Sequence, residues 1–517
     1  MNYKLFVLLL ICGFHANAQY KEVFKSHANV LQLPGFSLAV VKDGKVIYRQ
    51  MEGYADLEKR TPMGKEFLFQ IASVTKTFTA ALMMQYEQEG KASLEDYALN
   101  YRFINTRFGY PYNIDPDSRI RHYLSHTSEG NEAGTNFVYN GRRFNYIYGI
   151  FEKAGGHPPN ADAYPKELKQ RIFVPLHMEH TIAGFPVKRD DPVFARIAKP
   201  YLYDKTKQAF VEDTVNYRWT TAYPATGIMS TIDDLVKYAN AYDNNQLISA
   251  ASYQKITTPG ILKDGTQTPY GIGWFTEAIN GVKLHWHYGH ADSYAALFIR
   301  VPEQKLTFIF LSNSNAASDA LRLGAGHIWQ SPFAMSFLKY FAGLKADDEA
   351  VIGDALFRRY AENMYGTHQG EAEKMIAQLY KKTPGRFDQP DPSLIYLLTN
   401  LQGESLHEPL QHLITAWLKQ GHINPYVLTD IAAYYKKKGD TTNALLYYKM
   451  LADSKGFEDW SETIAACKAT GRYLLAAGKT EEGRKYYWRL INMIRVLGEG
   501  DDMINSVIAE MNAFQHR

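Results

Sequence analysis

The spacing of apolar residues changes along this chain. Residues 36–50, FSLAVVKDGKVIYRQ, hold two strand-like runs on either side of Asp43-Gly44, and this arrangement predicts a β-hairpin. Residues 70–91 instead repeat apolar side chains at helical spacing, and Gly90 closes the segment. This second segment is apolar on nearly all sides, so we expect a helix buried in the centre of a domain.

Strand-like runs return at residues 295–301 and 306–314. Strands at both ends of a segment, with helices between them, predict one mixed α/β domain over residues 19–340. Beyond that point strand-like alternation disappears and helical patterns take over. We therefore expect a second, α-helical domain over residues 341–517.

Two segments of the C-terminal region resemble each other. Residues 435–451 align with residues 474–490, and the alignment superposes Gly439 on Gly478 and one tyrosine pair on another. A repeated helix–turn–helix unit predicts a helical array. The segments resemble degenerate tetratricopeptide repeats with a longer period, and they fit a plain helical bundle as well.

The N-terminus, MNYKLFVLLLICGFHANAQ, has the pattern of a secretory signal peptide. Lys4 supplies the positive charge, the apolar run over residues 5–12 is too short to span a membrane, and residues 16–18 form an A-x-A cleavage site. We predict a signal peptide over residues 1–18, cleavage after Ala18, and a periplasmic or secreted product without a membrane span. Cys467 is then the remaining cysteine, so no intrachain disulfide is expected.

Composition indicates a large core and excludes one class of partner. The chain is 46% hydrophobic, which supplies enough apolar side chains for a large core. Its 57 Lys and Arg residues nearly balance its 54 Asp and Glu residues, and the one basic cluster, residues 435–439, is typical of a solvated helix end. A nucleic-acid partner is therefore not expected.

Candidate chemistry begins at residues 73–76, Ser-Val-Thr-Lys. Positions i and i+3 share one face of a helix, so the Ser73 hydroxyl and the Lys76 amine can meet. A serine hydroxyl needs a base to take its proton, and a lysine amine can do so when burial keeps it neutral. The spacing alone is not specific, because it recurs at Ser252…Lys255 and Ser336…Lys339.

The neighbourhood of Ser73 makes the motif specific. Several ordered segments resemble the serine β-lactamase and penicillin-binding-protein family, in its class C β-lactamase, D-alanyl-D-alanine carboxypeptidase and esterase branch. They cover most of residues 30–314 and read LPGFSLAVVKDGKVIY, GYADLEKRTP, IRHYLSHTS, AGTNFVYNGRRFNYIYGIFEKAGG, ATGIMSTIDDL, YGIGW and HYGHADSYAALFIRVPEQKLTFIFLSNS. The resemblance implies an α/β (α+β) transpeptidase-like domain, with an antiparallel sheet flanked by helices and an all-α part.

The resemblance also implies catalytic residues. Ser73 would be the nucleophile and Lys76 its partner, and Tyr139 would shuttle protons to the leaving group. The family's Tyr-x-Asn motif falls on Tyr139-Asn140-Gly141, so glycine replaces the family's asparagine and Asn140 stands one place early as the candidate for contact with a substrate amide. Residues 238–240, Tyr-Ala-Asn, fit the pattern better but lie where the family has no catalytic residue.

A third motif is implied at His287-Tyr288-Gly289, where this branch often has His-x-Gly. His287 would hold a substrate carboxylate or tune Tyr139, and Gly289 would let the substrate backbone approach the strand. The backbone N–H groups of Ser73 and His290 would form an oxyanion hole. Residues 368–370, His-Gln-Gly, match the same pattern in the helical region and are read as a coincidence.

The histidines of residues 283–292, KLHWHYGHAD, raise a metal alternative. His285 and His287 would share one face of a strand, which is a two-ligand nucleus for zinc. A zinc hydrolase site of the H-x-H-x-D-H type, however, needs an aspartate where Gly289 stands. We therefore expect no metal and no organic cofactor.

The leading hypothesis is an exported serine hydrolase that acts through an acyl-enzyme on a D-alanyl peptide, a β-lactam or a small ester. The first alternative is a non-catalytic recognition module of the penicillin-binding fold with a helical, partner-binding tail, which the Gly141 departure supports. The second alternative is the zinc hydrolase. One further departure is local: Glu129 follows Ser128 where the family usually has glycine.

Overall fold

The computed structural model describes residues 18–101, 115–130, 132–158, 162–345, 347–401, 403–457, 460–496 and 501–514. The predicted signal peptide, apart from Ala18, lies outside this range, and a helix occupies residues 18–30. Over the described part of the chain, no helix combines the length and apolarity needed to cross a bilayer.

Contacts between residues divide the chain into two compact units. We call residues 1–96, 143–260 and 267–376 the sheet unit, and residues 97–142, 261–266 and 377–517 the helical unit. The helical unit therefore includes a segment from the middle of the predicted α/β domain. The boundary at residue 340 remains a prediction from sequence.

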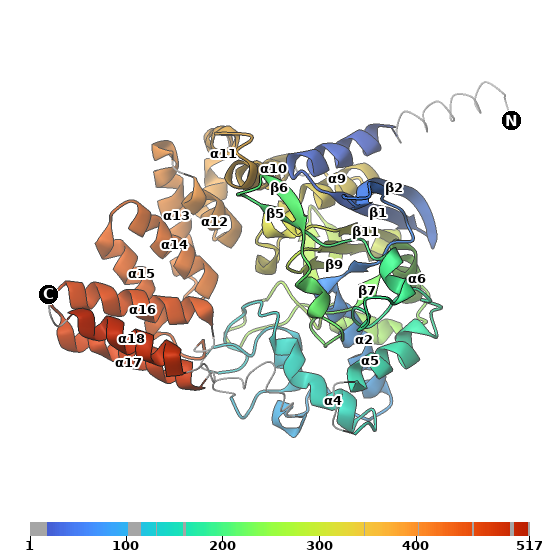
Figure 1. The fold of residues 1–517 in the computed structure, drawn as a ribbon, viewed down its shortest axis with the longest axis horizontal. Helices are drawn as coiled ribbons and strands as arrows, with labels where there is room; N and C mark the ends of the chain where they lie inside the picture. The colour runs from blue at the N-terminus through green and yellow to red at the C-terminus, as the bar shows by residue number, and fades with distance from the viewer. Residues whose placement is uncertain are drawn as a thin grey trace. The chain divides into compact units, whose positions relative to one another are not determined.

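The sheet unit is built on a seven-stranded antiparallel sheet in the order β3-β2-β1-β11-β10-β9-β8 (Figure 1). Its strands are β1 (Gly35–Lys42), β2 (Lys45–Asp56), β3 (Thr61–Pro62), β8 (Phe275–Ile279), β9 (Val282–His290), β10 (Ala295–Val301) and β11 (Leu306–Ser312). The predicted hairpin is confirmed, because β1 and β2 turn at Asp43 and Gly44, whose φ angles of 48° and 77° suit a tight hairpin turn. The strands predicted at 295–301 and 306–314 correspond to β10 and β11.

One face of this sheet is covered by aromatic contacts to two helices. Phe24, in the helix over residues 18–30, stacks on Phe308 of β11 with ring centroids 5.8 Å apart. Phe333, in α9 (Pro332–Phe341), packs on Phe310 of β11 at 4.3 Å. These rings supply a large apolar contact area on that face.

The opposite face carries α6 (Ile232–Asp243) and, behind it, α2 (Thr75–Gln88). Tyr238 of α6 contacts Phe298 of β10 at 5.7 Å and stacks on Phe78 of α2 at 3.8 Å. α2 is therefore enclosed within the unit, as its apolar pattern predicts. An antiparallel sheet flanked by helices confirms the predicted fold class.

The remaining elements of the sheet unit are short strands and helices around this core. They are β4 (Phe69–Gln70) paired with β7 (Met229–Ser230), β5 (Tyr201–Asp204) paired with β6 (Ala209–Glu212), α4 (Tyr148–Lys153), α5 (Ala163–Leu168), α7 (Ala250–Ile256), α8 (Ala316–Asp319) and α10 (Asp347–Tyr365). α11 (Glu371–Lys382) contains the point at which the chain passes to the helical unit.

The helical unit contains a run of consecutive helices, coloured orange to red in Figure 1. They are α12 (Pro392–Asn400), α13 (His407–Leu418), α14 (Pro425–Lys437), α15 (Thr441–Asp453), α16 (Ser461–Ala476), α17 (Thr480–Val496) and α18 (Asp501–Ala513); α3 (Ile120–Leu124) belongs to the same unit. Neighbours from α14 to α17 pack in succession, and Gly439 and Gly478 make the two equivalent turns with φ near 77° and 76°. The predicted helical C-terminal region is confirmed, and its membership of the tetratricopeptide class remains a prediction.

Candidate active site

Ser73 lies in a short 3₁₀ turn, η1 (Ala72–Val74), which joins β4 to α2. Ala72 has a φ of 45°, a left-handed conformation that costs a non-glycine residue about 1–3 kcal/mol. Ala72 and Val74 are buried, whereas Ser73 between them is partly exposed. The strained turn therefore presents the serine hydroxyl from an otherwise buried segment.

Lys76 lies in the first turn of α2 and its side chain is fully buried. Its Nζ atom is 2.8 Å from the Ser73 Oγ atom and 3.0 Å from the carbonyl oxygen of Ala225. The same nitrogen lies 5.4 Å from the centroid of the Phe144 ring. Burial lowers the pKa of Lys76 to about 7, so a large fraction of the amine is neutral at physiological pH and can accept a proton.

Two further segments hold this amine in place. Both are part of the family resemblance, which implied no role for either. The Ala225 N–H donates to the buried Asn145 Oδ1 at 3.0 Å, and Thr79 Oγ1 of α2 donates to the Pro224 carbonyl at 2.7 Å. Asn145 thus orients the peptide whose carbonyl accepts from Lys76. A polar Asn within the apolar run FNYIYGIF was the one signal in the sequence that could have identified it.

The end of β9 packs directly on the turn that carries the serine. A Cβ atom at Gly289 would lie 2.3 Å from the Ile71 carbonyl oxygen, so only glycine allows this approach. The Gly289 carbonyl accepts from Ser318 Oγ at 2.9 Å. His290 follows with an exposed side chain, whose Nε2 is 3.6 Å from Asp319 Oδ1. The structure therefore brings the Ser73 segment and the His287–His290 strand together.

A buried polar network supports the turn after His290. Ser293 Oγ donates to Asp213 Oδ2 at 2.8 Å and accepts from Asn216 Nδ2 at 2.8 Å. None of these three residues could be identified as functional from a local sequence motif. They tie the β9–β10 turn to a loop from the middle of the chain.

The His287 side chain is fully buried. Its Nδ1 is 2.6 Å from the Tyr288 carbonyl and so donates, which leaves Nε2 to accept from the Tyr270 hydroxyl at 2.9 Å. Burial, with a smaller contribution from Lys76, holds the pKa of His287 well below its usual value, so the ring is neutral. This favours a role in holding β9 over recognition of a carboxylate by charge.

The histidine cluster does not gather around a common point. His285 Nδ1 is 2.8 Å from the Tyr253 hydroxyl, whereas His287 and His290 make the separate contacts given above. Among the residues that the structure describes, no group of three or more His, Cys, Asp or Glu side chains is placed to hold a metal ion.

Tyr139 and Asn140 belong to the helical unit. The Tyr139 ring is partly buried, with its centroid 4.3 Å from that of His126. Asn140 donates through Nδ2 to Glu129 Oε1 at 2.7 Å and accepts through Oδ1 from the Arg142 N–H at 2.9 Å, so its carboxamide is engaged within its own segment. Because Tyr139 and Ser73 lie in different units, the approach of the two side chains remains a prediction.

The competing motifs occupy structural positions. Tyr238 is fully buried with its hydroxyl 3.0 Å from Thr77 Oγ1, and it forms part of the core between α6 and α2. Lys255 pairs with Glu87 at 2.6 Å, and Lys339 lies 4.0 Å from Asp347, so both lysines of the other Ser-x-x-Lys pairs face carboxylates.

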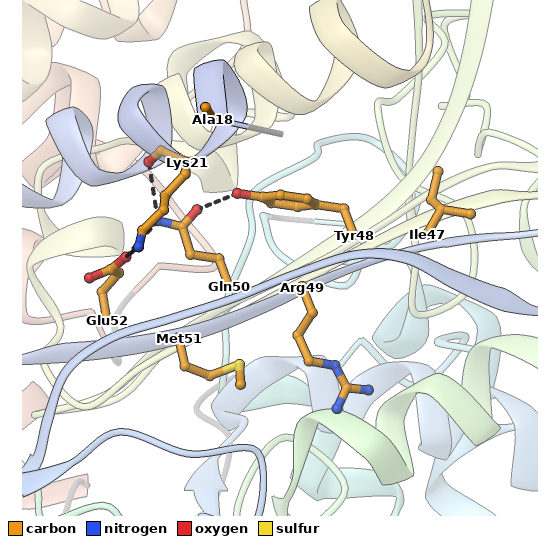
Figure 2. Close-up of a pocket in the computed structure, with 8 residues that line it drawn as sticks. All are labelled: Ala18, Lys21, Ile47, Tyr48, Arg49, Gln50, Met51 and Glu52. Carbon is orange, nitrogen blue, oxygen red and sulfur yellow. Dashed lines mark hydrogen bonds and ion pairs between the residues drawn. The ribbon is translucent and has the colours of Figure 1, made fainter. Parts of the chain in front are cut away.

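The sheet unit also contains a groove of about 550 Å³ between the helix over residues 18–30 and β2 (Figure 2). Gln50 Nε2 donates to the Lys21 carbonyl at 3.1 Å, and the Lys21 amine lies 3.5 Å from Glu52 Oε1. None of the candidate site residues lines it. The predicted cleavage after Ala18 would remove this residue from the wall of the groove. We therefore treat the groove as secondary to the site around Ser73.

The sheet and its serine–lysine pair define a serine hydrolase-like protein of the β-lactamase and penicillin-binding fold. The family model described as Beta-lactamase matches residues 22–329, and the chain belongs to this family. A D-aminopeptidase of Gluconobacter oxydans is 23% identical over 370 residues, which cover 63% of this chain and 67% of the relative. The penicillin-binding protein 4* of Bacillus subtilis is 25% identical over 352 residues, 60% of this chain and 75% of the relative.

A solved structure agrees with this fold. The octameric penicillin-binding protein homologue from Pyrococcus abyssi superposes with a TM-score of 0.51 at 23% identity. The match covers 62% of this chain and 77% of that one.

Proposed function

We propose that this protein is an exported serine hydrolase that cleaves an amide or ester through a covalent acyl-enzyme. The observation that carries the proposal is the buried Lys76 amine, which lies 2.8 Å from the Ser73 hydroxyl and has a pKa of about 7. A positioned neutral base beside a hydroxyl activates it as a nucleophile.

In the proposed reaction Ser73 Oγ attacks the carbonyl carbon while its proton passes to the Lys76–Tyr139 pair. The backbone N–H groups of Ser73 and His290 stabilise the negative oxygen that develops. The pair returns a proton to the leaving amine or alcohol as its bond to the carbonyl carbon breaks. Water then attacks the ester on Ser73 and gives a proton to the same pair, which passes it to Ser73 Oγ as the ester bond breaks and the acid is released.

The proposed substrate class rests on the names of the relatives and on the predicted periplasmic or secreted location. Relatives named D-aminopeptidase and penicillin-binding protein support a peptide with a D-residue at the scissile bond, with β-lactams and small esters as further acylating agents. A cleaved signal peptide would place the protein in the periplasm or outside the cell, where such peptides occur in wall fragments. Asn140 and Gly289 are the proposed contacts to that substrate, and His287 is proposed to hold β9, the strand along which the substrate would lie.

Covalent labelling tests this function. A fluorescent penicillin and a fluorophosphonate should each add one label, measured by intact mass, and Ser73→Ala should abolish it. Ser252→Ala is the matched control, because Ser252 also precedes a lysine by three positions but should leave labelling unchanged. Labelling that persists in Ser73→Ala would reject the proposal.

N-terminal sequencing of the exported protein tests the predicted cleavage after Ala18.

One observation favours a non-catalytic alternative. Gly141 replaces the family's asparagine, and the Asn140 carboxamide is already hydrogen-bonded to Glu129 and Arg142. A recognition module would bind a D-alanyl peptide reversibly without mass change. The intact-mass experiment separates the two.

A further inference from the structure

The segment that carries Tyr139 is anchored to the C-terminal helical region within the helical unit. Val138, Phe457 and Trp460 form a buried apolar cluster, against which Ile423 packs. On the other side of this contact, the Asn136 Nδ2 donates to the Ile423 carbonyl at 2.8 Å. Val138, immediately before Tyr139, is therefore held by side chains of the C-terminal region, and Asn136 is bonded 287 positions further along the chain.

A backbone contact continues the same attachment. The Gly130 N–H donates to the Gly456 carbonyl at 3.4 Å. A Cβ atom at Gly456 would lie 1.9 Å from the Gly130 carbonyl oxygen, and Gly456 has a φ of 78°. The two backbones approach as closely as glycine allows, so the segment before Phe457 is seated directly on the loop that precedes Tyr139.

Glu129 joins both sides of this contact. Its side chain is fully buried, with Oε1 accepting from Asn140 Nδ2 at 2.7 Å and Oε2 accepting from Trp460 Nε1 at 3.3 Å. A buried carboxylate is stable only where N–H groups solvate it, and hydrogen bonds to a charged acceptor are roughly twice as strong as neutral ones. Glu129 is also one of the two positions, with Gly141, at which the sequence departs from its family, and its contact with Trp460 ties this departure to the helical extension.

We infer that Glu129 and Trp460 are positioning residues for Tyr139. Through these two residues, the C-terminal helices contribute to catalysis. The inference rests on the proposed function, in which Tyr139 moves a proton. Val138 and Asn140 flank Tyr139, and both are held by the contacts described above. Proton transfer tolerates little misplacement of its groups, so loosening either anchor should slow the reaction without removing a reacting atom.

The test compares two conservative tryptophan substitutions in the full-length protein. Trp460→Phe keeps an aromatic ring in the cluster and removes the N–H that Glu129 accepts. Trp417→Phe is the matched control, because Trp417 is also buried in the helical unit and lies in α13. We expect Trp460→Phe to lower kcat for an ester substrate roughly ten- to a hundred-fold with KM nearly unchanged, and the control to retain wild-type kcat. Glu129→Gln, which keeps the side-chain shape, should give an intermediate loss.

A second measurement separates positioning from a general loss of structure. In a Tyr139→Phe background, Trp460→Phe should cause no further loss of kcat, because both changes act through the same group. Wild-type kcat in Trp460→Phe, or a full additional loss on top of Tyr139→Phe, would overturn the inference while Ser73-dependent labelling still upheld the proposed function. Loss of Ser73-dependence would instead reject the proposed function itself, and the inference with it.

Discussion

The Lys76 amine lies 2.8 Å from the Ser73 hydroxyl at the start of α2, and no part of the Lys76 side chain is exposed. Proximity and burial act together here. Proximity lets the amine exchange a proton with the serine, and burial lowers the pKa of the amine to about 7, where both protonation states are populated. The same burial makes the charged amine costly to the folded state.

The first prediction concerns pH. Because the base must be neutral, kcat/KM for acylation should rise about tenfold per pH unit below pH 7 and level off above it. Stopped-flow measurements with a chromogenic ester between pH 5 and 9 would give this profile. Lys76→Arg, which stays charged throughout, should show no such rise and very low activity.

A control distinguishes Lys76 from His287 as the group whose titration causes the rise in kcat/KM below pH 7, which we call the acid limb of the profile. Burial holds the pKa of the His287 ring well below its usual range, and its two nitrogens are engaged by the Tyr288 carbonyl and the Tyr270 hydroxyl. His287→Gln should therefore lower activity without moving the midpoint near pH 7. A midpoint that disappears in His287→Gln would assign the limb to the imidazole and contradict the role given to Lys76.

The second prediction is that Lys76→Met stabilises the protein while abolishing its activity. Between about pH 7 and 10.5, the Lys76 amine binds fewer protons in the folded state than in the unfolded chain. The free energy of unfolding that depends on this amine therefore rises with pH across that range. The destabilisation caused by burying the charged amine is largest below pH 7. Removing the buried amine should raise the free energy of unfolding at pH 7 by about 2 kcal/mol, after the lost hydrogen bonds are subtracted. Urea denaturation should show a smaller difference in the free energy of unfolding between Lys76→Met and the wild type at pH 9 than at pH 7.

Sequence patterns predicted those features that depend on local order. The Asp43-Gly44 hairpin, the strands at 295–301 and 306–314, and the contact between Ser73 and Lys76 each follow from the period of one short segment. The strained φ of Ala72 and the Asn145–Ala225 contact could not be predicted, because they arise where distant segments meet. The placement of residues 97–142 in the helical unit likewise depends on long-range packing that no local period encodes.

The third prediction concerns Asn145, whose Oδ1 accepts from the Ala225 N–H. Asn145→Asp keeps that acceptor but adds a carboxylate one peptide away from the Lys76 amine, so it should raise the pKa of Lys76 and move the acid limb of the rate profile to higher pH. Asn145→Leu removes the acceptor and should destabilise the fold by about 1–3 kcal/mol. The pH–rate profile and thermal unfolding check the two effects, and an unmoved limb in Asn145→Asp would argue against coupling through Ala225.

The fourth prediction concerns the contact between Gly289 and the serine turn. A methyl group at residue 289 would meet the Ile71 carbonyl oxygen at 2.3 Å and the Ala296 side chain at 3.0 Å, so either β9 or η1 must shift. Gly289→Ala should therefore cost about 1–3 kcal/mol of stability and lower the rate of Ser73 acylation, since both sides of the contact carry site residues. Gly385→Ala is the matched control, because a Cβ there meets no atom within 4 Å. Thermal unfolding and penicillin acylation rates would measure both changes, and a Gly289→Ala variant as stable and as reactive as Gly385→Ala would show that the close approach does not position the serine.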